Sequence, residues 1–401
     1  MTENSNTAPQ HPRIPVLMMA QELGWGGGIE RDVSKFARHV SKYGIDAHVA
    51  CFCRGGARWN EVESAGIPTV CIPVTSFKSP SVITAARQLK TYIAEHNIQV
   101  LHAFDAATDL FGVPLARLLG VPSLTSQLWN RYFLSRSSQL LLSVVDKIAR
   151  GIFVNSHAAA DELATNWHVP RNRIHVCQNG FEPKEFHPHG RKRPAQLAQA
   201  SVVIGTVAVL REEKNLGLLL DAFVQVHSFD PRAMLLIVGE GPMKESLANR
   251  AEQLGLKDVC LFQNATLTPA DWMRAIDIFV LCSRSESFPN ALLEAMACGC
   301  CPVGSRVGGM SELISHEKTG LLFDSGEVGQ LANALCRLTS DEVCRLRFAE
   351  AAVQFAHECL TIDVAAARLA DIYRQLLGRN TPPYEYSQTL SEVSTAVGAQ
   401  S

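Results

Sequence analysis

The chain has 401 residues, 47% of them apolar, and a formal net charge of -2 at pH 7. A chain of this length and composition predicts two domains of ordinary size with buried cores. The weak net charge gives no reason to expect a nucleic acid partner, and the apolar runs are much shorter than a membrane span.

Strands and helices alternate along the first half. Residues 1–12 are polar and contain no apolar signal segment, so we expect a disordered lead-in and a cytoplasmic protein. An apolar strand from about Arg13 to Ala20 precedes the loop ELGWGGG and a helix over IERDVSKFARHVSKYG, whose apolar residues recur at helical spacing. Further strands are predicted at DAHVACF, TVCIPV, IQVLHAF, SLTSQLW, GIFVNS and IHVCQN. This alternation predicts a parallel sheet covered on both faces.

The second half repeats the pattern, which predicts two doubly wound α/β domains. Strands are predicted at VVIGTVAVL, MLLIVGEG, VCLFQN, IFVLCS and GCCPVGS. Helices are predicted after Lys214, Met243, Pro269, Pro289 and Gly329. The polar, basic segment 189–201 is the expected linker between domains at 13–188 and 202–360. A last helix covers about 361–378, and the polar residues 379–401 are expected to be disordered.

The segment ESFPNALLE, residues 286–294, lies between a predicted strand and a predicted helix. In open parallel sheets ligands bind outside the carboxyl ends of the strands, which here would face a cleft between the two sheets. Pro289 suits the first turn of the helix, because its missing N–H would have no partner there. The free amides and the dipole of this helix start form a predicted phosphate site. Its amides belong to Asn290, Ala291 and Leu292.

Two acids flank that site, and they allow two interpretations. Glu286 precedes the helix and can reach a sugar hydroxyl, whereas Glu294 lies one turn inside and can accept both hydroxyls of a ribose. Acids are also common at helix starts, where they are exposed and only stabilise the helix. The spacing alone favours neither interpretation.

Cations follow the first strand of the second half, in VLREEKN. Arg211 and Lys214 could neutralise a departing diphosphate, although a solvated charge cluster is the ordinary alternative. No Asp-x-Asp pair suited to a nucleotide-bound metal is present, so protein cations are the expected counter-charge. The cluster Cys298, Cys300 and Cys301 has no second pair at ligand spacing, which predicts buried free thiols and no metal site.

Two loops of the first half carry weaker signals. The glycines of GWGGG, which include Gly26, Gly27 and Gly28, could present amides to phosphate, or could simply make a tight turn. In VLHAFD, His102 and Asp105 end a strand and could face a reacting sugar, although a lone histidine is more often structural.

The first helix carries cations at helical spacing, so these share one face. The face is either solvated or a docking surface for anionic lipid headgroups or a lipid-phosphate acceptor. Its residues are Arg31, Lys35, Arg38 and Lys42. A second, aromatic and basic patch that could assist consists of Trp129, Arg131, Tyr132, Phe133 and Arg136.

The block ESFPNALLEAMACGCCPVGSRVGGMSELI resembles the E-x7-E region of retaining glycosyltransferases of the GT-B fold, in particular family four, the glycosyl transferases group 1. Other blocks agree, follow the family's order and cover nearly the whole chain. They are GGGIERDV, VNSHAAADEL, VCQNGFEPKEFHP, LREEKN, VGEGPMKESL and EKTGLLF.

The resemblance implies two Rossmann-like domains facing a central cleft, with a final helix that crosses back to the first domain. It implies a nucleotide-sugar donor, a UDP-sugar or a GDP-sugar, and transfer with retention to a lipid-linked or glycan acceptor without a metal or other cofactor. By the family's pattern Glu286 contacts the donor sugar and Glu294 the ribose. Arg211 and Lys214 would hold the diphosphate. The amides after Phe288 and the loop at Gly26 to Gly28 complete the implied donor site.

Three positions depart from the family's pattern. Val209 stands where an arginine is expected, Phe104 where many members have a second histidine, and Gln263 where a glycine is common. Two alternatives therefore stay open: a nucleotide-sugar epimerase of the same fold, and a non-catalytic partner subunit that keeps only the fold.

Overall fold

A computed structural model describes residues 13–24, 27–128, 131 and 134–379. The predicted disordered lead-in and the tail from residue 380 onward lie outside the described residues. The chain forms two compact units. Unit 1 consists of the described residues of Met1–Asn155, Ala160–Cys177 and Asp363–Ser387, and unit 2 of those of Ser156–Ala159 and Gln178–Ile362.

Unit 1 is built on a seven-stranded sheet in the order β3-β2-β1-β4-β5-β6-β7, with every pair parallel. The central strand β1 is apolar and almost wholly buried, as expected for a parallel strand covered on both faces. Its register pairs Val16 with Ala47 of β2 and with Val100 of β4. The strands are β1 (Ile14–Ala20), β2 (Ile45–Cys51), β3 (Thr69–Cys71), β4 (Val100–Ala103), β5 (Ser123–Gln127), β6 (Gly151–Val154) and β7 (Ile174–Val176).

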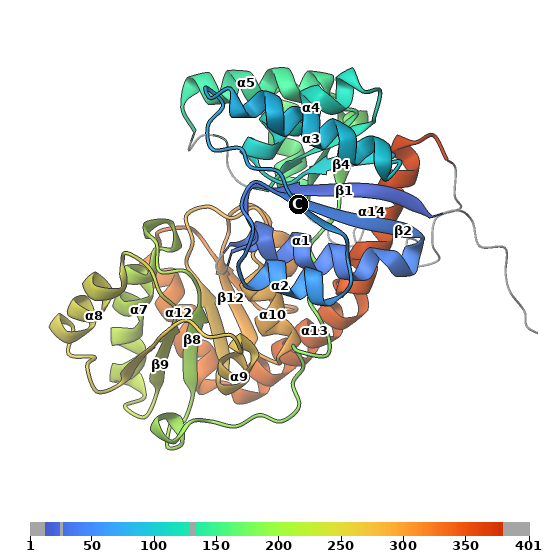
Figure 1. Cartoon of the computed structure of the whole chain (residues 1–401). Coiled ribbons are helices and arrows are strands. Elements are labelled where there is room, and N and C mark those ends of the chain that lie inside the picture. Colours follow the sequence, from blue (N-terminus) through green and yellow to red (C-terminus); the bar gives the residue numbers. More distant parts are fainter. Residues whose placement is uncertain (1–12, 25–26, 129–130, 132–133, 380–401) are drawn as a thin grey trace, which may run out of the picture. The chain divides into compact units, whose positions relative to one another are not determined.

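Helices cover both faces of this sheet. Figure 1 shows α3, α4 and α5 together on one face and α1, α2 and α14 on the other. The helices are α1 (Gly28–His39), α2 (Ala57–Ser64), α3 (Ser81–Glu95), α4 (Ala106–Leu118), α5 (Arg136–Ile148), α6 (His157–Asn166) and α14 (Ile362–Leu376), with 3-10 turns η1 (Val40–Tyr43) and η3 (Arg171–Arg173). The last helix therefore belongs to unit 1, although unit 2 precedes it in the chain.

Unit 2 is built on a six-stranded parallel sheet in the order β10-β9-β8-β11-β12-β13. Its strands are β8 (Val203–Val207), β9 (Met234–Val238), β10 (Cys260–Gln263), β11 (Ile278–Leu281), β12 (Cys301–Ser305) and β13 (Leu321–Phe323). Its helices are α7 (Leu216–Phe229), α8 (Lys244–Gln253), α9 (Pro269–Ala275), α10 (Asn290–Ala297), α11 (Met310–Leu313), α12 (Val328–Ser340) and α13 (Glu342–Cys359), with turns η4 (Ala195–Leu197) and η5 (Glu212–Lys214).

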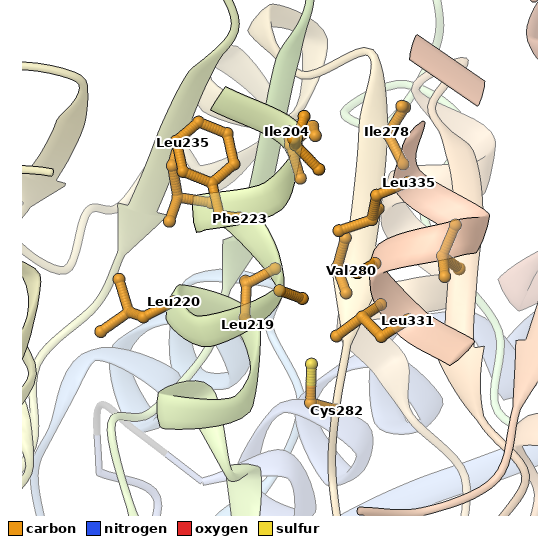
Figure 2. Close-up of a cluster of buried hydrophobic side chains, with 14 of the residues drawn as sticks. Ile204, Leu219, Leu220, Phe223, Leu235, Ile278, Val280, Cys282, Leu331 and Leu335 are labelled. Carbon is orange, nitrogen blue, oxygen red and sulfur yellow. The ribbon is translucent and has the colours of Figure 1, made fainter. Parts of the chain in front are cut away.

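The core of unit 2 explains why these segments fold as they do. Leu219 and Phe223 on α7 and Leu331 and Leu335 on α12 recur at helical spacing and face the strands, so their apolar side chains are removed from water together (Figure 2). Cys282, just after β11, lies in the same cluster, and burial raises the pKa of its thiol. The sulfur therefore acts as an apolar side chain at this position.

The strand β13 and the helix α13 were not predicted, because β13 has only three residues and α13 lacks a clear apolar stripe. The predicted linker 189–201 is packed onto unit 2. Leu197 lies in a core cluster of unit 2, and Arg191 and Arg193 both pair with Asp277. The structure accordingly draws the division between units at Gln178, ahead of the expected boundary.

Within the described residues, no helix combines the length and the apolar character that crossing a bilayer requires.

Candidate functional site

The strands β8 and β11 are neighbours at the point where the strand order of unit 2 reverses. Chain connections leave such a point in opposite directions, which opens a crevice at the carboxyl ends of the two strands. Lys214 follows β8 and Glu286 follows β11, and Lys214 Nζ lies 2.6 Å from Glu286 Oε1. Ser283 Oγ donates to the same oxygen at 2.6 Å. Two residues that are 72 positions apart in the chain thus form an ion pair at the switch point.

The loop that carries Lys214 is held by close backbone packing. The Leu210 N–H donates to the Glu240 carbonyl at 2.8 Å. A Cβ on Gly241 would lie 2.5 Å from the Leu210 carbonyl oxygen, so only glycine allows this approach. The Arg284 N–H donates to the Glu213 carbonyl at 2.8 Å and links this loop to the one after β11. The backbone that carries Lys214 is therefore held in place, and it positions the ammonium group.

The loop that carries Glu286 rests on two glycines. Gly308 has a φ of +47°, and a Cβ there would lie 1.7 Å from the Glu286 carbonyl oxygen. The Gly309 N–H donates to the Ser287 carbonyl at 3.0 Å. These two glycines therefore support the backbone of Glu286, the acid that is predicted to contact the donor sugar.

The helix α10 begins directly after this loop, at Asn290, with Pro289 as its N-cap instead of inside its first turn. The Leu292 N–H donates to the Pro289 carbonyl at 3.1 Å, so this amide is already used by the helix. Asn290 Oδ1 accepts a hydrogen bond of 2.9 Å from Asn179, a buried residue that the sequence reasoning missed. The polar ending of the strand VCQN was its only signal. Phe288 is buried in the apolar core.

Burial decides between the two interpretations of the acids. The side chain of Glu286 is 11% exposed, and Glu294 is 1% exposed. Exposed acids that only stabilise a helix start would lie in water, so that interpretation is wrong. A buried carboxylate is costly and is retained where it is paired or functional. The roles of Glu286 and Glu294 toward a sugar and a ribose stay predictions.

Arg211 does not join the pair at the switch point. Its side chain is 61% exposed, and its guanidinium lies 3.9 Å from Glu213. This placement fits the solvated charge cluster better than a diphosphate contact. Lys214 is the cation that the fold positions.

The switch point of unit 1 lies between β1 and β4. Asp105 accepts the Gln21 N–H at 2.6 Å and caps α4, where it accepts the Ala107 and Thr108 amides at 3.0 and 2.9 Å. Burial raises its pKa despite these hydrogen bonds. The carboxylate is therefore engaged in structure, and this placement does not support its predicted catalytic role.

His102 is fully buried in unit 1. Its Nδ1 lies 2.7 Å from the Tyr373 hydroxyl on α14, and its Nε2 lies 2.8 Å from Ser126 Oγ. Burial lowers the pKa of His102 well below its ordinary value, so the ring is neutral. The histidine fastens α14 to the sheet, which is the structural alternative considered for it.

We expect His102 to make the protein less stable in acid. A histidine with a lowered folded pKa must lose its buried, neutral state when it is protonated. The contribution of His102 to the free energy of unfolding is complete above the unfolded pKa of about 6.5 and falls by about 1.4 kcal/mol per pH unit below it. Urea unfolding of the wild type and of His102→Gln between neutral and mildly acidic pH measures this slope. Equal slopes in the two proteins would contradict the prediction.

The glycine loop lies in negative surroundings. Gly26 lies outside the described residues, Gly27 caps α1, and Gly28 opens it. Glu30 accepts a hydrogen bond from its own amide in the first turn, and burial raises its pKa, with further contributions from Glu22, Asp105 and Asp32. Carboxylates near Gly27 and Gly28 disfavour an anion there, and the phosphate contact of the loop stays a prediction.

The basic face of α1 is largely engaged within unit 1. Lys35 is buried and lies 3.3 Å from Asp32, and Lys42 pairs with Asp363 at 2.6 Å. In the second patch Trp129, Tyr132 and Phe133 lie outside the described residues. Arg131 is buried and pairs with Asp146 at 2.6 Å, which leaves Arg136 as its exposed cation. Lys35 and Arg131, which are buried, therefore cannot contact a lipid headgroup, and a docking role for the rest of the two patches stays a prediction.

The cysteine cluster consists of buried thiols, as predicted for it. Cys298, Cys300 and Cys301 are all buried and free, and Cys300 Sγ donates to the Met273 carbonyl at 3.1 Å. In the part of the chain that the structure describes, no group of three or more His, Cys, Asp or Glu side chains is arranged to hold a metal ion.

Comparison with known families covers both units. Residues 191–355 match the family Glycosyl transferases group 1, and residues 26–185 match Glycosyltransferase Family 4. The chain belongs to the group 1 glycosyltransferases. The pair Lys214–Glu286 and the buried Glu294 of this glycosyltransferase lie within the group 1 match.

Individual relatives agree with this assignment. The glycosyltransferase is 28% identical over 273 residues to N-acetyl-alpha-D-glucosaminyl L-malate synthase of Bacillus anthracis, with 67% of this chain and 68% of the relative covered. It is 25% identical over 303 residues to UDP-Gal:alpha-D-GlcNAc-diphosphoundecaprenol alpha-1,3-galactosyltransferase of Escherichia coli, with coverages of 72% and 77%. Its fold is the GT-B fold. The crystal structure of Anabaena HepE in complex with UDP and glucose superimposes with a TM-score of 0.78 at 21% identity, covering 90% of this chain and 100% of HepE.

Proposed function

We propose that this glycosyltransferase moves a hexose-type sugar, with retention and without a metal ion, from a nucleotide diphosphate sugar to a hydroxyl of a lipid-linked or glycan acceptor. The donor is a UDP-sugar by preference, with a GDP-sugar as the second choice. The reaction belongs to cell-envelope polysaccharide or glycolipid synthesis. It takes place in the cytoplasm, with peripheral contact to the inner face of an anionic membrane.

The relatives support the donor and acceptor classes. The galactosyltransferase of Escherichia coli is named for a UDP-sugar donor and a diphosphoundecaprenol-linked acceptor. The HepE structure holds UDP and glucose. Both findings are compatible with the ion pair of this chain, in which a lysine lies beside a carboxylate.

One observation carries the proposal: the ion pair of Lys214 and Glu286 at the switch point of unit 2, with Ser283 on the same carboxylate oxygen. A lysine fixed there can stabilise the charge that develops on the departing diphosphate. Glu286 can accept a hydroxyl of the donor sugar beside it. The bond from the anomeric carbon to the phosphate oxygen breaks, a bond to the acceptor oxygen forms on the same face, and the departing phosphate takes the acceptor proton.

We expect UDP to raise the melting temperature of the wild type by roughly 5–10 °C when it is present at a hundredfold excess over its Kd. The shift should be the same in EDTA. In Glu294→Gln it should be much smaller, because the amide cannot accept both ribose hydroxyls. GDP and ADP serve as competing ligands, and the ligand-free melting temperature of the variant shows whether it folds. A full UDP shift in Glu294→Gln would contradict the role of Glu294.

Product analysis separates the alternatives. A transferase turns over a UDP-sugar only slowly without an acceptor, whereas an epimerase converts it to a second nucleotide sugar. A non-catalytic subunit leaves the donor unchanged under both conditions. Transfer of the sugar to an added acceptor, with the anomeric configuration retained, supports the proposal.

A further inference from the structure

The helix α5 presents apolar residues on two faces. Leu142 and Val145 are buried under it in unit 1. Leu140, Leu141 and Val144 point the other way, with exposed fractions of 68%, 54% and 51%. A helix that only covers a sheet needs a single apolar face, so the second face requires another explanation.

Cations surround this second face. Arg136 and Lys147, near the two ends of α5, and Arg150 just beyond it are all exposed. The neighbouring helix α4 ends with the exposed Arg117 and Leu118, and Leu118 is 83% exposed. We call these residues of α4, α5 and Arg150 the α4–α5 surface.

Carboxylates are missing from the same surface. Over the described residues between 106 and 150 the acids are Asp109 and Asp146, and both are buried. Asp146 is neutralised by Arg131 at 2.6 Å. Because the whole chain has a net charge of -2, its exposed carboxylates must lie outside the α4–α5 surface.

A second exposed apolar pair gives a contrast. Val343 and Leu346 on α13 are also exposed, but Asp341, Glu342 and Glu350 lie beside them in the sequence and are exposed as well. Exposed apolar side chains therefore also occur on another helix, and their combination with cations that no exposed carboxylate of α4 or α5 opposes distinguishes the α4–α5 surface.

We propose that the α4–α5 surface docks on an anionic lipid bilayer, with Leu140, Leu141 and Val144 inserted among the headgroups. Apolar side chains enter the interface between headgroups and acyl chains, and flanking lysines and arginines are attracted to anionic lipid. Charge complementarity favours this occupant over a second copy in a two-fold dimer, because such a dimer would bring the same cations face to face. The proposal places the peripheral membrane contact on α5, and not on the basic face of α1 that the sequence suggested. It does not require the transfer reaction, because docking needs no donor.

Sedimentation with vesicles tests it on the full-length protein without nucleotide. The wild type should bind vesicles of equal parts phosphatidylglycerol and phosphatidylcholine, and should not bind pure phosphatidylcholine. The triple variant Leu140→Ser, Leu141→Ser, Val144→Ser should partition at least tenfold more weakly. The triple variant Arg136→Gln, Lys147→Gln, Arg150→Gln should lose about fivefold per charge at low salt.

The matched control is Val343→Ser with Leu346→Ser, which removes exposed apolar groups from acidic surroundings and should leave vesicle binding unchanged. Melting temperatures confirm that each variant is folded. Unchanged binding of the Leu140 triple variant, or equal binding of both vesicle types by the wild type, would overturn the proposal. The proposal would also be overturned if the wild type did not bind vesicles but formed a dimer in analytical ultracentrifugation, and if the Leu140 triple variant were monomeric.

Discussion

Replacing Lys214 by methionine is expected to lower kcat/KM for the donor by about 10²- to 10³-fold, the usual cost of one group that stabilises transition-state charge. The variant loses the cation aimed at the diphosphate. It also leaves the 11% exposed carboxylate of Glu286 without its ammonium partner, with Ser283 still donating to it. The measurement is the initial rate of UDP release over a range of donor and acceptor concentrations.

Two companions sharpen this test. Lys214→Arg keeps the charge but changes its shape and reach, so we expect a smaller loss, about tenfold. Arg211→Gln removes an exposed cation from the same loop and should change kcat/KM by less than about twofold, because exposed charges are screened by water. If Arg211→Gln were as damaging as Lys214→Met, the assignment of the diphosphate contact to Lys214 alone would be wrong.

Gly308→Ala is expected to be nearly as damaging, although residue 308 carries no functional group. Its Cβ would lie 1.7 Å from the Glu286 carbonyl oxygen, so the loop after β11 must move. The movement takes Glu286 away from Lys214, and we expect kcat/KM to fall by at least about 10²-fold, as small misplacements at a catalytic site can do. Assays of UDP release measure the loss of catalysis, and the UDP-induced melting shift measures separately whether nucleotide binding changes.

A second glycine serves as the control for backbone strain. Gly255 has a φ of +73°, and a Cβ there would meet nothing within 4 Å. It precedes β10, at the opposite end of the strands from the site. Gly255→Ala should therefore lower the free energy of unfolding by about 1 kcal/mol and leave the rate unchanged. If Gly308→Ala behaved in the same way, the contact with Glu286 would not matter for catalysis.

The parts of the fold that follow from local pattern could be predicted. Long apolar runs such as those of β1 and β9 identify buried strands, and their alternation with helices gives parallel sheets. The three residues Leu321–Phe323 are too few to show any period, so β13 could not be found in this way. Arg191 and Arg193 looked like linker residues because their partner Asp277 lies more than 80 residues away.

The site could be predicted as a set of residue types but not as contacts. Lys214 and Glu286 each stand after a strand, and the topology of a doubly wound sheet brings such positions together. Their ion pair and its support by Gly308 depend on tertiary packing. The role of His102 is set by Tyr373, which is 271 residues further along the chain, so no local pattern could distinguish a structural histidine from a catalytic one.

That long-range bond also determines the order in which the protein can be completed during synthesis. The strands of unit 1 leave the ribosome first, yet α14, which supplies Tyr373 to His102 and Asp363 to Lys42, is among the last segments to emerge. The sheet of unit 1 therefore waits with one face incompletely covered while all of unit 2 is translated. Unit 2, whose residues from Gln178 to Ile362 are contiguous, can close as soon as its own helices have appeared. Unit 1 can therefore be completed only after unit 2 has been translated, although amino-terminal domains usually fold first during synthesis.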